Sequence, residues 1–217
     1  MERLSIDTLV NKDNPLSISY VPSDLIAVDN NEYNFHEYSD PNLKPMVSSQ
    51  IYIPFLDLEM ASVYDGLHIT VDSGYRSAQY QRALFMNRFI LNRTDIKAKF
   101  PDIGPEELDA EAYKLTTSQV AKMGCSEHQT GYAFDIACYR NGEYSAATTE
   151  EERGWMNENA HRFGFILRYP KGKEEITGFD FEPWHYRYVG NDIANRLYNG
   201  GDWITLEEYH KSLKLKL

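Results

Sequence analysis

Cysteine is scarce in this chain: Cys125 and Cys138 are the only two among 217 residues. Two cysteines cannot build a disulfide framework, and their spacing is not that of a zinc knuckle. Positive charge is also in short supply, because 33 acidic residues outnumber 22 Lys and Arg and give a formal net charge of −11. Since a phosphate backbone is bound through surplus Lys and Arg, no nucleic-acid partner is expected.

Long apolar runs are missing from the sequence as well. No stretch approaches the roughly 20 apolar residues of a membrane-spanning helix, so no span is expected. Met1 is followed by Glu2 and Arg3 rather than by a basic and then an apolar signal. Read as a full-length chain, the protein is expected in the cytoplasm. If a leader was removed, an extracytoplasmic or membrane-anchored location is expected instead.

The composition predicts one globular domain over residues 1–217. Hydrophobic residues make up 42% of the chain and charged residues 25%, which is the range of folded domains. No internal repeat, low-complexity tract or linker divides it. Residues 1–45 are polar and contain turn signals such as Asn14-Pro15 and Asp40-Pro41, so this segment is expected to wrap over the domain surface.

Periodicity predicts helices and strands that alternate along the rest of the chain. Helices are expected at 46–64, from Ser77, at 105–124, through 155–163, and from Thr205, which forms a capping-box pair with Glu208. Strands are expected at 68–72, 131–138, 165–169 and 184–189. This order favours an α+β fold with a small central antiparallel sheet flanked by helices.

A histidine and a carboxylate lie near the predicted strand 131–138. His128 precedes the strand, and Asp135 lies on the face that carries small residues, where a metal and a substrate have room. Catalytic zinc takes three imidazole or carboxylate ligands and leaves one position open. His185, with Glu182 nearby, offers a third ligand. This spacing also arises by accident, and a histidine beside Trp184 is compatible with ordinary packing, so the residues alone leave the metal site open.

Three spaced motifs resemble the VanY-like D-alanyl-D-alanine carboxypeptidases and follow the order found in that family. They are Ser73-Gly74-Tyr75-Arg76-Ser77, Ser126-x-His128-x-x-Gly131-x-Ala133-x-Asp135 and Glu182-x-Trp184-His185. The resemblance covers roughly residues 65–190, the expected catalytic core, and implies a zinc site at the sheet. The absence of a leader and the late segment from Trp203 to His210 are similar to the soluble VanXY type, which acts on both the D-Ala-D-Ala dipeptide and the pentapeptide stem.

The resemblance implies a role for each residue of the centre. His128, Asp135 and His185 would hold one Zn²⁺ per chain, and Glu182 would act as the general base. Arg76 would bind the substrate carboxylate, because a guanidinium offers that group a planar pair of donors. Stabilisation of the oxyanion and a structural ion pair are the alternatives for Arg76.

Further residues are implied to line the pocket. Ser126 and Gln81 would hydrogen-bond the substrate, and Trp184 is either pocket wall or core. Ser73 stands where some dual-activity relatives carry an aspartate that could meet the ammonium group of a dipeptide, so the serine puts dipeptidase activity in doubt. Cys125 also forms a C-x-x-H pair with His128, but the ligand set is complete without it.

The expected function is removal of the C-terminal D-Ala, or a similar D-residue, from peptidoglycan stem peptides. Cleavage of the D-Ala-D-Ala dipeptide and a contribution to glycopeptide resistance are further expectations of the resemblance. One alternative is an L,D-carboxypeptidase acting on tetrapeptide stems, because the motifs define metal chemistry and not stereochemistry. The other alternative is a non-catalytic zinc-scaffold binding domain.

Overall fold

The computed structural model describes residues 3–28 and 44–215 and is organised around a five-stranded antiparallel sheet. The strands run in the order β3 (Ile69–Ser73), β4 (Ala133–Arg140), β7 (His185–Tyr188) and β6 (Phe165–Leu167), and β5 (Glu143–Ser145) pairs with β4. A smaller sheet pairs β1 (Leu25–Ala27) with β2 (Met46–Ser48). The predicted α+β fold with a central antiparallel sheet is confirmed.

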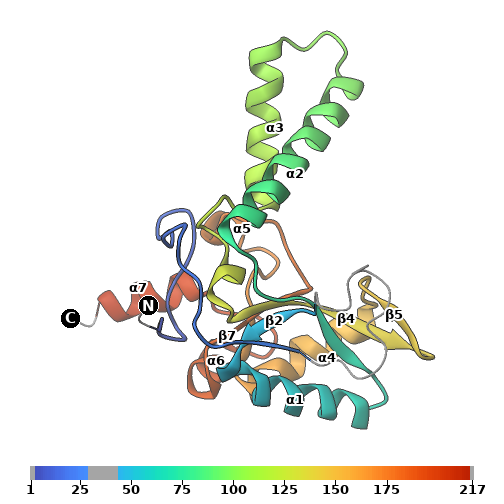
Figure 1. Cartoon of the computed structure of the whole chain (residues 1–217), viewed down its shortest axis with the longest axis vertical. Helices are drawn as coiled ribbons and strands as arrows, with labels where there is room; N and C mark the ends of the chain where they lie inside the picture. The colour runs from blue at the N-terminus through green and yellow to red at the C-terminus, as the bar shows by residue number, and fades with distance from the viewer. Residues whose placement is uncertain (1–2, 29–43, 216–217) are drawn as a thin grey trace.

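Helices surround this sheet unevenly. Helices α1 (Ser49–Tyr64) and α4 (Glu150–Asn159) lie on one side of it, whereas α2 (Ala78–Lys99) and α3 (Pro105–Gln119) form a hairpin that projects from the body (Figure 1). The shorter helices are η1 (Glu127–Thr130), η2 (Ala160–Phe163), α5 (Glu174–Thr177), α6 (Asn191–Leu197) and α7 (Leu206–Lys214). None of the helices in the described ranges has the length and apolar character needed to cross a bilayer.

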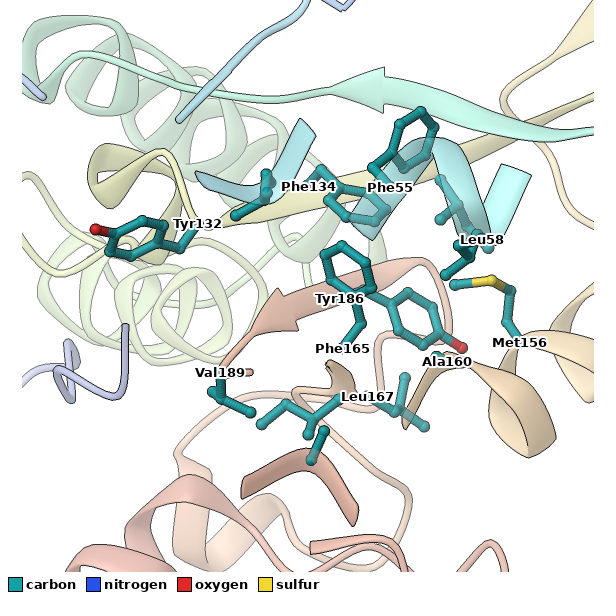
Figure 2. Packing of buried hydrophobic residues seen from close by; sticks show 14 of the residues in the cluster. Phe55, Leu58, Tyr132, Phe134, Met156, Ala160, Phe165, Leu167, Tyr186 and Val189 are labelled. Carbon is teal, nitrogen blue, oxygen red and sulfur yellow. The ribbon is translucent and has the colours of Figure 1, made fainter. Parts of the chain in front are cut away.

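The hydrophobic core lies between the sheet and α1, as Figure 2 shows. Phe134 on β4 is fully buried, and its ring meets the rings of Phe55 and Phe165 edge-on, with centroids 5.4 Å and 5.1 Å away. Burying one such side chain contributes about 1.5–3 kcal/mol. Because alternate residues of a strand face opposite sides, packing Phe134 into this core turns Asp135 toward the other side of the sheet.

Local capping explains where several helices begin. Ser77 accepts a hydrogen bond from the backbone N–H of Tyr80 at 3.1 Å, which confirms the predicted start of α2. Thr205 and Glu208 make the predicted capping box at α7, with reciprocal hydrogen bonds of 3.1 Å and 2.8 Å. Pro105 occupies the first turn of α3, where the missing N–H costs nothing.

Two predicted helix boundaries were wrong. Residues 46–48 form β2 rather than the start of a helix, because they pair with β1 and Ser48 caps α1 by accepting from the N–H of Gln50. Helix α3 ends at Gln119 rather than near Gly124, since Val120 adopts an extended backbone conformation. The segment that follows therefore turns back toward the sheet.

The described part of the N-terminal segment lies across the body of the protein. Arg187 on β7 donates to the carbonyl oxygens of Ile6 at 2.8 Å and Thr8 at 2.9 Å. The side-chain amide of Gln129 donates to the carbonyl oxygens of Ser17 at 2.8 Å and Tyr20 at 3.0 Å. Residues 29–43 of the predicted wrapping segment fall outside the described residues.

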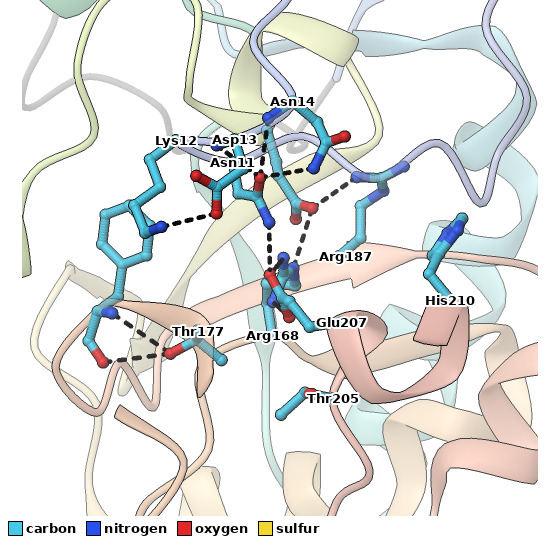
Figure 3. Close-up of polar contacts among 12 residues, drawn as sticks. Asn11, Lys12, Asp13, Asn14, Arg168, Thr177, Arg187, Thr205, Glu207 and His210 are labelled. Atoms are coloured by element: carbon cyan, nitrogen blue, oxygen red, sulfur yellow. Dashed lines mark hydrogen bonds and ion pairs between the residues drawn. The ribbon is translucent and has the colours of Figure 1, made fainter. Parts of the chain in front are cut away.

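A buried ionic network joins this segment, the sheet and α7 (Figure 3). Glu127 Oε1 lies 2.9 Å from both Arg168 Nε and Arg187 Nη1, and none of the three side chains is exposed. Arg168 also donates two hydrogen bonds, of 2.9 Å and 2.7 Å, to the carboxylate of Glu207 on α7. Burial opposes ionisation of Glu127, but the two guanidinium groups outweigh it and lower its pKa.

Candidate metal centre

Three side chains from separate segments meet on the side of the sheet opposite the core. His128 comes from η1, Asp135 from β4 and His185 from the start of β7, where it is the register partner of Asp135. Asp135 Oδ1 lies 3.3 Å from His128 Nε2 and 3.2 Å from His185 Nδ1. All three residues are buried, and their nearest ligand atoms lie within 4.8 Å of one another. This arrangement can hold a metal ion.

The imidazole of His128 is oriented by a backbone contact. Its Nδ1 atom lies 2.7 Å from the carbonyl oxygen of Gly74, so Nδ1 donates and Nε2 keeps the lone pair that a metal requires. Burial, and then the charge of Arg76, lower the pKa of His128 to about 4, which keeps the ring neutral at neutral pH.

The donor atoms of this centre fit a bound cation. His128 Nε2 and Asp135 Oδ1 are buried, and neither has a hydrogen-bond partner in the described ranges. A buried acceptor without a donor costs free energy, and a cation between the two atoms would remove that cost. Two imidazole nitrogens and one carboxylate oxygen are the donors of a catalytic zinc site.

Arg76 forms an ion pair with the second oxygen of Asp135. Its Nη2 contacts Asp135 Oδ2, and its Nε donates to Ser73 Oγ at 3.0 Å. Burial opposes ionisation of Asp135, but His128 and Arg76 together hold the pKa of this carboxyl well below its usual range. The structure thus shows the ion pair that was one of the alternatives for Arg76, and it leaves Asp135 Oδ1 facing the two histidines.

Glu182 lies beside the three residues. Its Oε2 is 3.6 Å from His185 Nδ1, and 13% of its side chain is exposed. The backbone N–H of His185 donates to the carbonyl oxygen of Glu182 at 3.2 Å, so a tight turn around Pro183 holds the two side chains on the same side. Burial raises the pKa of Glu182 to about 7. A carboxyl group with that pKa can both take and return a proton near neutral pH.

A cavity of about 350 Å³ opens in front of this centre. It is lined by Arg76, Gln81, Ser126 and Trp184 in addition to the metal-centre residues. Gln81 donates through Nε2 to the carbonyl oxygen of Ala121 at 2.9 Å, whereas its buried Oε1 has no hydrogen-bond partner in the described ranges. Ser126 is buried and Trp184 is 43% exposed. Ser73 is not one of the lining residues and instead accepts from Arg76.

Several residues of the cavity were not anticipated from the sequence. Tyr169 is buried with its ring centroid 4.9 Å from that of His185, and Phe179 packs on Tyr169 at 4.6 Å. The cavity is also lined by a face of α2 formed by Leu84, Asn87, Arg88 and Leu91. The helical spacing of the two leucines was a signal for that face. Cys125 is not part of the three-residue metal centre.

Two imidazoles, one carboxylate and a carboxyl group of raised pKa beside a cleft define a metallohydrolase-type centre. Residues 44–191, more than half of the chain, match the family model VanY, D-alanyl-D-alanine carboxypeptidase. The chain belongs to the VanY family of D-alanyl-D-alanine carboxypeptidases.

Curated relatives agree with this assignment. The chain is 36% identical to the putative carboxypeptidase YodJ of Bacillus subtilis over 97% of its own length and 68% of that protein. It is 36% identical to a D-alanyl-D-alanine carboxypeptidase of Enterococcus faecalis, over 93% of its length and 64% of the relative. It is 31% identical to VanXYC of Enterococcus gallinarum, a bifunctional D-Ala-D-Ala dipeptidase and carboxypeptidase, over 94% and 93%.

Solved structures show the same fold. A vancomycin resistance D,D-pentapeptidase VanY in complex with Zn(II) is 35% identical, with a TM-score of 0.73 and coverage of 94% of this chain and 98% of that one. VanYB in complex with D-alanine-D-alanine is 35% identical, with a TM-score of 0.74 and coverage of 95% and 97%. The LD-carboxypeptidase LdcB is 32% identical, with a TM-score of 0.72 and coverage of 95% and 86%.

Proposed function

We propose that the chain is a zinc-dependent D,D-carboxypeptidase that removes the C-terminal D-Ala from peptidoglycan stem peptides. The convergence of His128, Asp135 and His185 carries the proposal, because their donor atoms suit zinc and lie at one end of a substrate-sized cavity. A VanY structure that contains Zn(II) and a VanYB structure that contains D-Ala-D-Ala support it. By removing D-Ala-D-Ala ends, such an enzyme would lower the target available to glycopeptide antibiotics.

Glu182 is the proposed proton carrier. A bound zinc ion supplies Lewis acidity, which polarises a carbonyl group and makes a water molecule more acidic. Glu182 Oε2, beside His185, then takes the proton of the attacking water and returns it to the leaving amine. Its pKa of about 7 suits both transfers.

The remaining residues orient the substrate. Arg76 lines the cavity and its guanidinium offers a planar pair of donors, so we assign it the carboxylate of the terminal D-residue in addition to its ion pair with Asp135. The Oε1 of Gln81, which has no hydrogen-bond partner in the described ranges, can accept a hydrogen bond from a substrate N–H, and Ser126 lines the same cavity. Trp184 supplies apolar surface at the exposed side of the cavity.

Replacing Glu182 by glutamine tests this assignment. The variant keeps the shape of the side chain but removes the basic oxygen, so turnover of a D-Ala-D-Ala-terminated peptide should fall by at least about 10²-fold while zinc stays bound. Glu175→Gln, on the short helix α5 outside the cavity, is the matched control. Undiminished turnover in the zinc-loaded Glu182→Gln variant would exclude Glu182 as the base.

We do not extend the dipeptidase activity of some relatives to this chain. Ser73 lies where dual-activity relatives are expected to carry an aspartate, and here its hydroxyl accepts from Arg76 and offers no charge to an ammonium group. We therefore expect a pentapeptide to be cleaved much faster than the free D-Ala-D-Ala dipeptide. Comparable rates on the two substrates would favour a bifunctional enzyme of the VanXYC kind.

An L,D-carboxypeptidase is the second candidate, because the chain is also similar to LdcB. The metal centre can serve either reaction. The two reactions differ in the configuration, D or L, of the residue before the scissile bond. Release of D-Ala from a pentapeptide but not from a tetrapeptide would support D,D specificity. The reverse result would support L,D specificity. If the zinc-loaded protein hydrolysed neither substrate, a non-catalytic binding role would be favoured.

A further inference from the structure

The cavity continues away from the metal centre along one face of α2. Leu84, Asn87, Arg88 and Leu91 all line it, and their spacing of i, i+3, i+4 and i+7 places them in one stripe along the helix. Leu84 is half-buried, and the other three residues are exposed. Phe179 and Trp184 line the same cavity. The stripe is therefore an open extension of the candidate active site rather than part of the core.

Arg88 gives this extension a positive charge in a protein of net charge −11. No ion pair neutralises Arg88 within residues 3–28 and 44–215. Arg93 on the same helix is neutralised by Asp109 of α3, with Nε and Oδ1 2.6 Å apart. Arg82 also lies on α2 but does not line the cavity. A guanidinium that lines a cleft and has no ion-pair partner in the described ranges can bind a carboxylate of a ligand.

We propose that this face of α2 binds the part of the stem peptide upstream of the scissile bond, and that Arg88 determines specificity by binding a carboxylate there. The inference rests on the proposed function. Arg88 follows Gln81 by seven residues, which is about 10 Å along a helix axis. An extended peptide covers that distance in about three residues. The carboxylate that Arg88 binds therefore lies about three residues upstream of the bond that is cut.

Two groups of a stem peptide can supply this carboxylate. One is the free α-carboxyl group of the γ-linked D-glutamyl residue, three residues upstream, and the other is the carboxyl group at the end of the long side chain of a diaminopimelyl residue, two residues upstream. Both offer the same planar partner to a guanidinium. Pentapeptides with a free or amidated D-glutamyl carboxyl group, each with lysine or diaminopimelate as the next residue, separate the two sources.

The test compares Arg88→Gln with Arg82→Gln and wild type in the zinc-loaded full chain. On a pentapeptide with the free carboxylate, kcat/KM should fall about tenfold in Arg88→Gln, equivalent to about 1.4 kcal/mol. It should stay within about twofold on N-acetyl-Lys-D-Ala-D-Ala, since that tripeptide carries neither of the two candidate carboxylates. For the wild type, amidating the carboxylate of the pentapeptide should lower kcat/KM by the same factor of about ten. For Arg88→Gln, amidation should not lower kcat/KM further.

Other outcomes would overturn the inference. If kcat/KM fell equally in Arg88→Gln and Arg82→Gln, the loss would come from the lower net positive charge of α2 and not from a contact with Arg88. If Arg88→Gln lost as much kcat/KM on the tripeptide as on the pentapeptide, the substitution would be acting at the metal centre. Failure of the wild type to hydrolyse either peptide would count against the proposed function instead. In that event, calorimetric binding of the intact pentapeptide to zinc-loaded wild type and Arg88→Gln still decides the question, because equal affinities would refute a role for Arg88.

Discussion

The Nδ1 atom of His128 lies 2.7 Å from the carbonyl oxygen of Gly74, and this contact decides which nitrogen of the imidazole faces the metal centre. Gly74 itself is held tightly, since a Cβ atom added there would lie 2.1 Å from the carbonyl oxygen of Met46. The backbone of β2 therefore touches the loop that orients a candidate ligand. The second residue of the Ser73-Gly74-Tyr75-Arg76 motif thus has a structural reason to be glycine.

Gly74→Ala should weaken zinc binding, because relief of the clash with Met46 must move the carbonyl oxygen that positions His128. Loss of such an outer contact typically costs about 10–100-fold in metal affinity. A competition titration with a chromophoric chelator would measure it. Gly154→Ala is the control: its Cβ would meet nothing within 4 Å in the exposed part of α4, and it should stabilise the fold by about 0.5–1 kcal/mol. Unchanged zinc affinity in Gly74→Ala would contradict the orienting role.

Zinc should stabilise the folded chain measurably. An ion that binds only the folded state at 100 times its Kd adds about 2.7 kcal/mol, which corresponds to a rise in Tm of roughly 5–10 °C for a chain of this size. Asp135→Ala removes one proposed ligand and should abolish the shift, whereas Glu182→Gln should retain it. Calorimetric scans with zinc and with a chelator would show this. A shift that survives in Asp135→Ala would place the zinc elsewhere.

The sequence could predict the metal centre but not the contacts around it. The seven-residue spacing of His128 and Asp135 left the site open, and the resemblance of the three motifs to the family implied the full candidate ligand set with His185. The Arg76–Asp135 ion pair was undecided because it depends on how β3 pairs with β4, including the irregularity between Val71 and Ser73. Such pairing is set by tertiary packing.

The cleft face of α2 was missed for a related reason. Tyr80, Leu84, Phe85 and Phe89 follow one helical periodicity, and that pattern does not distinguish core from the wall of a cavity. In the structure Phe85 is buried whereas Leu84 faces the cavity. The early end of α3 was also hidden, because no glycine or proline marks Val120 as a stop.

Removing charge from the buried network should be strongly destabilising. Glu127→Gln leaves Arg168 and Arg187 buried without their shared carboxylate, so we expect a loss of about 3–5 kcal/mol in the free energy of unfolding. Glu207→Gln should cost less, because 14% of the Glu207 side chain is exposed and Arg168 keeps Glu127. Urea unfolding at constant zinc concentration would compare the two variants. Equal losses would show that the degree of burial does not set the cost.

Glu152 should make the stability of the fold depend on pH in the acid range. Although burial disfavours its ionised form, hydrogen bonds from Arg140 Nε at 2.7 Å and the backbone N–H of Thr149 at 2.7 Å lower its pKa to about 2. Because this pKa is depressed, the ionised carboxylate stabilises the protein above the ordinary value near 4.5. That contribution is lost as the pH falls from about 4.5 toward about 2.

Glu152→Gln should therefore destabilise the protein by about 2 kcal/mol at pH 7, a figure reduced for solvent screening because 36% of the Arg140 side chain is exposed. The difference from wild type should narrow steadily between pH 4.5 and pH 3 in urea unfolding experiments. Glu151→Gln, at the neighbouring exposed position, should change the free energy of unfolding by no more than about 0.5 kcal/mol, both at pH 7 and between pH 4.5 and pH 3. A gap between wild type and Glu152→Gln that stayed constant with pH would mean that the variant acts through packing or the α4 capping box, and not through the charge of Glu152.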